Sequence, residues 1–232
     1  MPVVDSSASS SEHLREASSE RGQIVLRRRG TDGAQELRVN GVFVMDDRET
    51  STERQLARAA LDALDAPVDA ALRILVAGLG LGYTLRAVLD DARTHDVLVA
   101  EIEPALVEWH RAGTVPGGAL DDPRVQLAFG DVRDLVATLS DSSLDLVLLD
   151  VDNGPGFLVY DANAAIYQVD FLRGCRRVLA AHGRCAVWSS APTPDLVATL
   201  TDVFETCTTT DIPVLLGSRE TTYHLLLAPA GV

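Results

Sequence analysis

The sequence has few of the residues and patterns that mark nucleic-acid-binding, disulfide-stabilised or metal-binding proteins. Only 20 of its 232 residues are basic against 34 acidic ones, and the net charge of −14 repels a phosphate backbone. Its three cysteines form no CxxC pair, so neither a disulfide framework nor a zinc knuckle is indicated. His110 and His182 have no second histidine at metal-ligand spacing. We therefore expect no nucleic-acid partner and no bound metal.

A long apolar run and a leader pattern are also lacking. The N-terminus has no basic segment followed by an apolar one. The most apolar stretch, residues 74–89, is interrupted by three glycines and Arg86. We therefore expect a protein that neither spans nor enters a membrane and that works in the reducing cytoplasm.

Hydrophobic residues make up 47% of the chain, which is enough for one substantial core and a small additional sheet. Residues 1–21 are rich in serine and glutamate, so we predict a disordered tail there. Residues 22–50 hold three short apolar runs that are separated by turn signals at residues 30–33 and at Asn40-Gly41. This pattern predicts a small N-terminal antiparallel β-meander of three strands.

Strand and helix patterns alternate along residues 51–232, which predicts an α/β domain with a Rossmann-like, doubly wound and mostly parallel sheet. A helix near residue 51 leads into it, because a Ser or Thr followed by Glu suits a helix start. Two β-rich segments at the end predict a C-terminal antiparallel hairpin. The expected strands cover residues 72–78, 96–102, 124–129, 144–151 and 183–190, and the expected helices begin near Gly82, Pro104, Val132, Asn163 and Pro194.

Three glycines, Gly78, Gly80 and Gly82, follow the first of these strands in a GxGxG pattern and precede a helix. In that context glycines let the chain turn sharply and let a ligand approach the backbone. A dinucleotide-binding fingerprint needs a further glycine where Tyr83 stands, so the spacing favours an adenosyl sulfonium of the S-adenosylmethionine type. We predict that this turn, including Leu81, binds that ligand; a tight turn without a ligand is the alternative.

Acidic residues follow the next two strands at the same edge of the sheet. Glu101 ends one strand about twenty residues after the turn, where a carboxylate can accept hydrogen bonds from both ribose hydroxyls. For Glu103 we favour a role at the start of the following helix. Asp131 and the adjacent Val132 are predicted to bind the adenine, although an Asp at this place also suits a helix N-cap.

A fourth strand ends at Asp150 and continues into a loop with Gly and Pro that carries Asp152 and Asn153. Two carboxylates on a loop over the cofactor would bind a cationic amine and accept its proton, so Asp150 and Asp152 are the predicted catalytic residues. An ordinary turn, which uses Asp and Asn for their backbone preferences, is the alternative. Asn153 and Tyr160 are predicted to contact the substrate, and Tyr167 is a further candidate for the pocket wall.

In this order the motifs resemble the spermidine synthase family, the polyamine aminopropyltransferases and their relatives. The resemblance covers nearly everything after the tail, including the glycine turn, EIEP, GDVRD, LLDVDNGPG and RVLAAHGRCAVW. It implies a class I S-adenosylmethionine-dependent methyltransferase fold in which Glu101 and Asp131 hold ribose and adenine. It also implies that Asp150 and Asp152 handle the attacking nitrogen of a small amine or polyamine. The exposed edge of the meander is compatible with a homodimer.

Three departures from that family bear on the reaction. Leu81 stands where the family has an aspartate that grips the amine of decarboxylated S-adenosylmethionine, which favours a donor that keeps its carboxylate. The loop after Asp150 is shorter than the family's usual loop. The helix start STERQLARAAL lacks a tyrosine that helps to bind the polyamine.

We therefore predict transfer of an alkyl group, methyl ahead of aminopropyl, from the sulfonium of S-adenosylmethionine to a small amine. Three further reactions or roles stay open. The first is aminopropyl transfer from decarboxylated S-adenosylmethionine to putrescine, the reaction of spermidine synthases. The second is intramolecular cyclisation of S-adenosylmethionine, and the third is a homologue that binds the ligand without catalysis.

Overall fold

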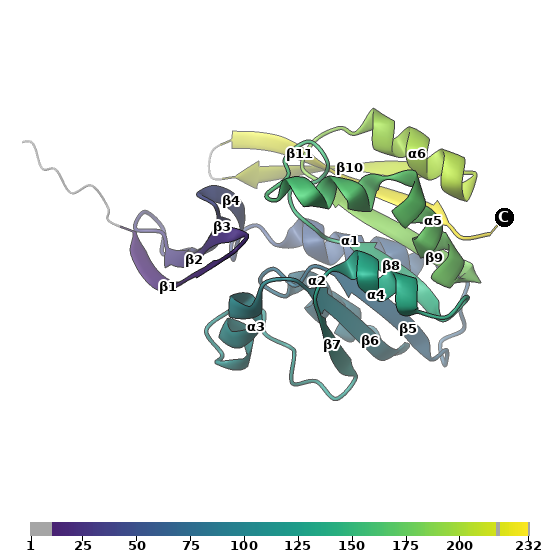
Figure 1. The fold of residues 1–232 in the computed structure, drawn as a ribbon, viewed down its shortest axis with the longest axis horizontal. Coiled ribbons are helices and arrows are strands. Elements are labelled where there is room, and N and C mark those ends of the chain that lie inside the picture. Colours follow the sequence, from purple (N-terminus) through teal and green to yellow (C-terminus); the bar gives the residue numbers. More distant parts are fainter. Residues whose placement is uncertain (1–10, 217–218, 232) are drawn as a thin grey trace, which may run out of the picture.

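The computed structural model describes residues 11–216 and 219–231, which form two β-sheets (Figure 1). The first is an antiparallel four-stranded sheet, the N-terminal meander. The second is a seven-stranded, mostly parallel sheet flanked by helices, which confirms the predicted fold class. The meander consists of β1 (Glu12–Ser19), β2 (Gly22–Arg28), β3 (Gln35–Val39) and β4 (Val42–Asp46).

The structure differs from the prediction at the start of the meander, because β1 occupies part of the stretch that was predicted as a disordered tail. β1 pairs antiparallel with β2, and Ala17 lies opposite Ile24. Leu14 and Ala17 pack against the core. Hydrogen bonds between the two backbones stabilise this strand although its sequence is mostly polar, and composition does not reveal them. The first part of the predicted tail, residues 1–10, lies outside the described residues.

The large sheet has the strand order β10-β11-β9-β8-β5-β6-β7. Strands β5 to β9 are parallel to one another, and the antiparallel pair β10 and β11 forms the predicted C-terminal hairpin. The strand order reverses between β5 and β8, and such a switch point opens a crevice at the carboxyl ends of the strands. The strands are β5 (Leu72–Ala77), β6 (Thr94–Glu101), β7 (Val125–Phe129), β8 (Leu144–Leu149), β9 (Leu179–Ser189), β10 (Thr208–Leu216) and β11 (Arg219–Pro229).

Helices cover both faces of this sheet, and the apolar core consists of two halves, one on each face. Leu56 of α1, Leu85 of α2 and Leu106 of α3 belong to the half that also contacts the meander. Leu172 of α5 and Phe204 of α6 belong to the other half. Within the described ranges, no helix is both long and apolar enough to cross a bilayer. The helices are α1 (Ser51–Asp62), α2 (Tyr83–Leu89), α3 (Pro104–Arg111), α4 (Val132–Thr138), α5 (Val169–Val178) and α6 (Pro194–Phe204), with a 3-10 helix, η1, at Asp161–Tyr167.

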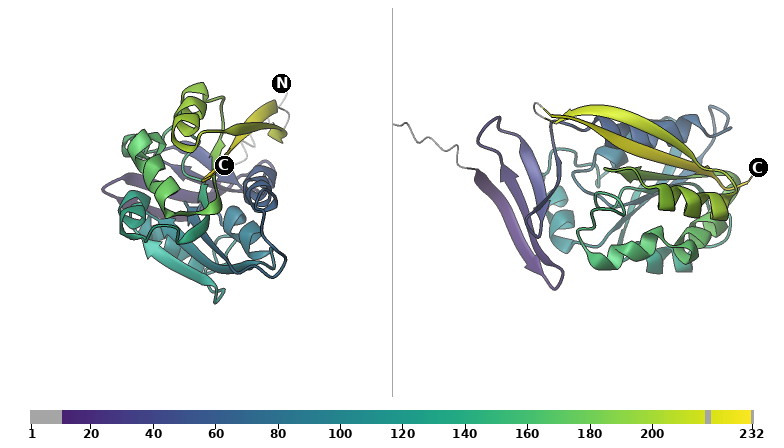
Figure 2. Two further views of the ribbon diagram at one scale, coloured as in Figure 1. Left: turned by 90° about the vertical axis from the view of Figure 1, so that its right-hand side faces the viewer. Right: turned by 90° about the horizontal axis from the view of Figure 1, so that it is seen from above.

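The meander stands at one end of the α/β body (Figures 1 and 2). Two hydrogen bonds fasten it to segments that directly follow parallel strands. Arg21 donates to the carbonyl oxygen of Ile102, after β6, at 2.9 Å. Asn153, after β8, donates from its side chain to the carbonyl oxygen of Phe43 at 3.1 Å. The meander therefore covers the end of the sheet where ligands bind in folds of this type.

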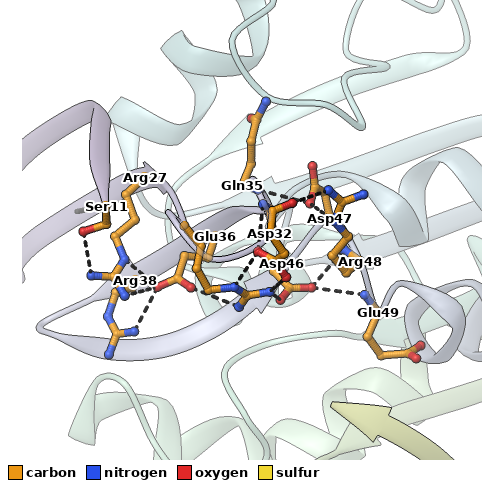
Figure 3. A network of polar contacts seen from close by, with 12 residues as sticks. Ser11, Arg27, Asp32, Gln35, Glu36, Arg38, Asp46, Asp47, Arg48 and Glu49 are labelled. Carbon is orange, nitrogen blue, oxygen red and sulfur yellow. Dashed lines mark hydrogen bonds and ion pairs between the residues drawn. The ribbon is translucent and has the colours of Figure 1, made fainter. Parts of the chain in front are cut away.

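Glu36 of β3 is the centre of a charged network on the meander (Figure 3). Its side chain is only 2% exposed and accepts hydrogen bonds from Arg27 at 2.6 Å, Arg29 at 3.2 Å and Arg38 at 3.0 Å. Arg29 also pairs with Asp46 at 3.0 Å. The carboxylate tolerates burial because these guanidinium groups replace the water that it loses.

We expect Glu36→Gln to lower the free energy of unfolding by about 1–3 kcal/mol, because a neutral amide leaves Arg27 and Arg38 without a counter-charge and Arg29 with only its aspartate partners. The loss is moderate because the three arginine side chains are 28–30% exposed, so water solvates them in part. Urea denaturation measures the change. Glu20→Gln, at an exposed position between β1 and β2, is the matched control. Equal unfolding midpoints for both variants would show that the network adds no stability.

Candidate active site

A cavity lies between the meander and the carboxyl ends of the parallel strands. Small-molecule sites occur preferentially at such a switch point of an α/β sheet. The meander supplies an apolar wall that includes Leu37, Val39 and Met45. Six carboxyl side chains also line the cavity, whereas no Arg, Lys or His of the described residues does. The six are Glu53, Glu101, Glu103, Asp131, Asp150 and Asp152.

The glycine-rich turn forms one side of the cavity through Gly78, Leu79 and Gly80. Gly78 has a φ of +92°, and a Cβ at this position would lie 2.1 Å from the carbonyl oxygen of Asp150. Gly80 has a φ of +49°, and a Cβ there would lie 2.7 Å from Sδ of Met45. Only glycine combines the left-handed backbone with such close approach. The turn therefore presents bare backbone to the cavity, as a ligand-binding loop requires.

Leu81 and Gly82 were predicted to bind the ligand, but the structure places them behind the cavity wall. The Leu81 side chain is fully buried in the core, and its amide donates to Sδ of Met45 at 3.2 Å. Gly82 is the left-handed N-cap of α2, where a Cβ would lie 2.7 Å from the carbonyl oxygen of Gly117. The start of α2 draws both residues into the core, so they shape the turn from behind the residues that line the cavity.

Glu101 lines the cavity at the end of β6, next to the turn. One carboxylate oxygen accepts from the amide of Leu79 at 3.0 Å, and the other accepts from the amide of Glu103 at 2.7 Å. Burial raises the pKa of Glu101, and these amides oppose the shift. Each oxygen can accept a second hydrogen bond, so capacity for a diol is retained. Contact with ribose stays a prediction.

Asp131 and Val132 line the cavity at the end of β7. Asp131 is the N-cap of α4, since its carboxylate accepts from the amide of Arg133 at 2.8 Å. It also pairs with the Arg133 guanidinium at 2.6 Å, which holds the pKa of Asp131 below its usual value. The capping alternative is confirmed, and contact with adenine stays a prediction.

Asp150 follows β8 and lines the cavity beside the turn. The hydroxyl of Thr84 donates to its carboxyl group at 2.5 Å. Burial raises the pKa of Asp150 to about 6, and the Thr84 hydrogen bond opposes this shift. Such a group is mostly ionised at neutral pH and still binds a proton readily, which are the properties of a general base.

Asp152 also lines the cavity, so the structure brings the two predicted catalytic acids together. Its φ of 56° is unusual for a residue other than glycine, and Asn163 donates to its carboxylate at 2.8 Å. Burial raises its pKa. Asn153, predicted to contact the substrate, is not part of the lining, because its side chain binds the backbone of Phe43 in the meander.

Tyr160 lines the cavity, and its hydroxyl donates to Glu103 at 3.0 Å. Tyr167 does not line it, because this buried side chain donates to the carbonyl oxygen of Val151 at 2.7 Å. Glu103 occupies the N-cap position of α3, as expected, yet its side chain makes no capping hydrogen bond. It pairs instead with Arg21 at 3.3 Å, and thereby connects the cavity to the meander.

Two cavity residues, Glu53 and Trp188, were not predicted from the sequence. Glu53 lies in the first turn of α1 and is 6% exposed. Burial, followed by the charge of Asp150, raises the pKa of Glu53 to about 8. Trp188 lies on β9, and its indole N–H has no partner among the described residues. A helix-start pattern and a large aromatic residue were the sequence signals at these positions, and neither indicates a binding site.

The charges of the cavity suit a cationic organic ligand. Arg133 neutralises Asp131, and Arg21 neutralises Glu103. The four remaining acids, which lie on α1, at the end of β6 and on the β8 loop, form no ion pair within the part of the chain that the structure describes. In that same part, no group of three or more His, Cys, Asp or Glu side chains could hold a metal ion. Carboxylates without a cation in the protein attract one from solution.

No family model matches the chain, but curated proteins do. A polyamine aminopropyltransferase of Aeropyrum pernix is 28% identical over 146 residues, which cover 53% of this chain and 43% of that protein. Polyamine aminopropyltransferase 2 of Pseudomonas aeruginosa is 36% identical over 138 residues, which cover 53% of this chain and 36% of that protein. The chain therefore spans less than half the length of these two relatives.

Solved structures share the fold. A crystal structure of spermidine synthase in complex with the transition state analogue AdoDATO has a TM-score of 0.80 at 17% identity, and the match covers 95% of this chain and 74% of that chain. Human methyltransferase-like protein 13 in complex with SAH has a TM-score of 0.62 at 20% identity, with coverage of 77% and 82%. At these identities the likeness concerns the fold alone. Together with the sequence relatives it confirms the predicted resemblance: the chain is similar in sequence to polyamine aminopropyltransferases and shares the fold of a spermidine synthase and of a methyltransferase-like protein.

Proposed function

We propose that the chain transfers an aminopropyl group from decarboxylated S-adenosylmethionine to a small amine such as putrescine. The observation that carries this proposal is the acidic cavity, in which four carboxyl groups lack a cationic partner within residues 11–216 and 219–231. Both substrates of this reaction are cations, so the charge of the site suits each of them. The names of the curated relatives support the same reaction.

Aminopropyl transfer suits this cavity better than the methyl transfer that Leu81 suggested. The Leu81 side chain is buried in the core and does not set the charge of the cavity. Glu53 adds a carboxyl group from α1 instead. A donor that keeps its carboxylate would bring a further negative charge among six acids, with no arginine in the cavity lining to receive it. A decarboxylated donor avoids this repulsion.

The residues of the site have three tasks in this reaction. The backbone of Gly78 and Gly80 admits the adenosyl part, and Glu101 is positioned for its ribose hydroxyls. Asp152 orients the acceptor through a charge-assisted hydrogen bond. Asp150 takes a proton from the acceptor ammonium, so the nitrogen lone pair can attack the carbon bound to the sulfonium. A C–N bond forms as the C–S bond breaks, and the sulfur leaves as a neutral thioether that needs no proton.

Product analysis with two donors tests this function. We expect decarboxylated S-adenosylmethionine and putrescine to give methylthioadenosine, and S-adenosylmethionine with the same amine to give no adenosylhomocysteine. Chromatography of the nucleoside products measures both. Adenosylhomocysteine from the second donor, without product from the first, would contradict the proposal and support methyl transfer.

The same assay distinguishes aminopropyl transfer from cyclisation and from binding without catalysis. Nucleoside release from S-adenosylmethionine alone, with no amine present, would indicate intramolecular cyclisation. Donor binding without nucleoside release across a panel of diamines and triamines would indicate a non-catalytic homologue. Either result would reject aminopropyl transfer.

A further inference from the structure

We propose that Glu53 binds the terminal ammonium of the donor's alkyl chain and thereby selects a donor that lacks a carboxylate. The inference rests on the proposed function and names the residue of this chain that sets its donor specificity. It assigns this selectivity to α1, a different element from the glycine turn.

The position of Glu53 next to the turn is the first support. Thr84, near the start of α2, links it to Asp150: the Thr84 hydroxyl donates to Asp150 at 2.5 Å and lies 3.3 Å from the carbonyl oxygen of Glu53. Gly78 is in contact with the backbone of Asp150. Glu53 and Asp150 therefore lie at the part of the cavity where the sulfonium carbon must meet the acceptor. A short alkyl chain on that sulfur reaches Glu53 without leaving the cavity.

The unmet hydrogen-bonding capacity of Glu53 is the second support. Its side chain is 6% exposed, and one carboxyl oxygen accepts from the hydroxyl of Thr52 at 2.9 Å. Among the described residues, the backbone amide of Glu53 itself is a further donor to this carboxyl group, and no cationic side chain pairs with it, although the side chain lines the cavity. Trp188 lines it too, and an indole ring attracts a cation that lies over its face. A buried carboxyl group in this state is satisfied when a ligand ammonium supplies N–H donors and positive charge.

The protonation of Glu53 changes when such a ligand binds. Glu53, with a pKa of about 8, is mostly protonated at pH 7 in the free protein, whereas Asp150, with a pKa of about 6, is mostly ionised. An ammonium favours the ionised carboxylate, so binding lowers the pKa of Glu53 and releases a proton. The other ionisable groups around Glu53 are Tyr83 on α2, Tyr223 on β11, and Glu49 and Arg54 on its own segment.

Calorimetry of the full chain with three thioether ligands tests the assignment. Methylthioadenosine has no ammonium, aminopropylthioadenosine has one, and adenosylhomocysteine has an ammonium and a carboxylate. We expect the unsubstituted protein to bind aminopropylthioadenosine most tightly. Glu53→Gln should weaken that complex about 10–100-fold and leave the methylthioadenosine complex unchanged. Glu108→Gln, at an exposed position of α3, is the matched control and should leave all three affinities unchanged.

Proton release is a second readout that does not depend on how the variant folds. In buffers of different ionisation enthalpy at pH 7, the unsubstituted protein should release about one proton with aminopropylthioadenosine and none with methylthioadenosine. Equal weakening of both complexes in Glu53→Gln, or no proton release by the unsubstituted protein, would overturn the assignment. Methylthioadenosine formation from the decarboxylated donor and putrescine is scored separately, so its absence would reject the proposed function and not the role of Glu53 in binding.

Discussion

Asp150→Asn should lower kcat about 10²–10⁴-fold, which is the contribution typical of a positioned general base. Asparagine has the same size and can still accept a hydrogen bond from Thr84, but it cannot remove a proton from the acceptor ammonium. Affinity for methylthioadenosine should stay nearly the same, because that ligand contains neither the acceptor nor its proton. Initial rates with decarboxylated S-adenosylmethionine and putrescine, together with calorimetry, measure the two effects.

The pH profile of the same variant is an independent check. The pKa of Asp150 is raised to about 6, and the base is active when ionised, so kcat/KM for putrescine at saturating donor should rise between about pH 5 and pH 7 in the unsubstituted protein. This rise should be absent in Asp150→Asn. Asp170→Asn, at an exposed position in the first turn of α5, is the matched control. A variant with full turnover would exclude Asp150 from proton transfer.

Gly78→Ala should abolish donor binding and lower the free energy of unfolding by about 2–5 kcal/mol. Two costs add at this position. The backbone has a φ of +92°, which disfavours any side chain, and the new Cβ would lie 2.1 Å from the carbonyl oxygen of Asp150. Relief of this clash must move the turn away from the end of β8, which separates the ligand-binding backbone from the proposed base. Urea denaturation and calorimetry with methylthioadenosine measure both effects.

Gly113→Ala is a suitable control for this second prediction. Gly113 has a φ of +66°, but no atom lies within 4 Å of a Cβ built there. It therefore carries only the backbone cost of roughly 1–2 kcal/mol and should leave ligand binding intact. If Gly78→Ala lowered the free energy of unfolding and the ligand affinity no more than Gly113→Ala, the close contact between the turn and Asp150 would contribute to neither.

The large sheet could be predicted from the sequence because its strands are continuous apolar runs that end in turns or acids. β5 illustrates this, since its buried residues lead directly into Gly78. β1 could not be predicted in the same way. Its residues are mostly polar, and it is a strand because β2 pairs with it, which is a property of two segments together. The predicted homodimer is not tested by a single chain and stays a prediction.

The candidate site, like the fold, could be predicted from the sequence only in part. Glu101 and Asp150 stand at the carboxyl ends of β6 and β8, the two parallel strands on either side of β5, so their place at the same edge of the sheet follows from the topology alone. Glu53 comes from a helix, and its place in the cavity depends on how α1 packs against the sheet, which no local pattern encodes. For Leu81 a local pattern suggested a site residue that the structure does not place in the cavity lining. Its position in the glycine turn suggested a ligand contact, but the start of α2 directs its side chain into the core.

The two sheets share an apolar cluster, to which Leu37 and Leu56 both belong, but they also enclose the cavity. Leu37 and Val39 of the meander and Glu101 of the large sheet line this space. A ligand that fills this space replaces the missing part of a shared core. Occupancy at a hundred times the dissociation constant adds about 2.7 kcal/mol to the folded state. The meander and the large sheet should therefore be held together least firmly when the cavity is empty and most firmly when substrates fill it.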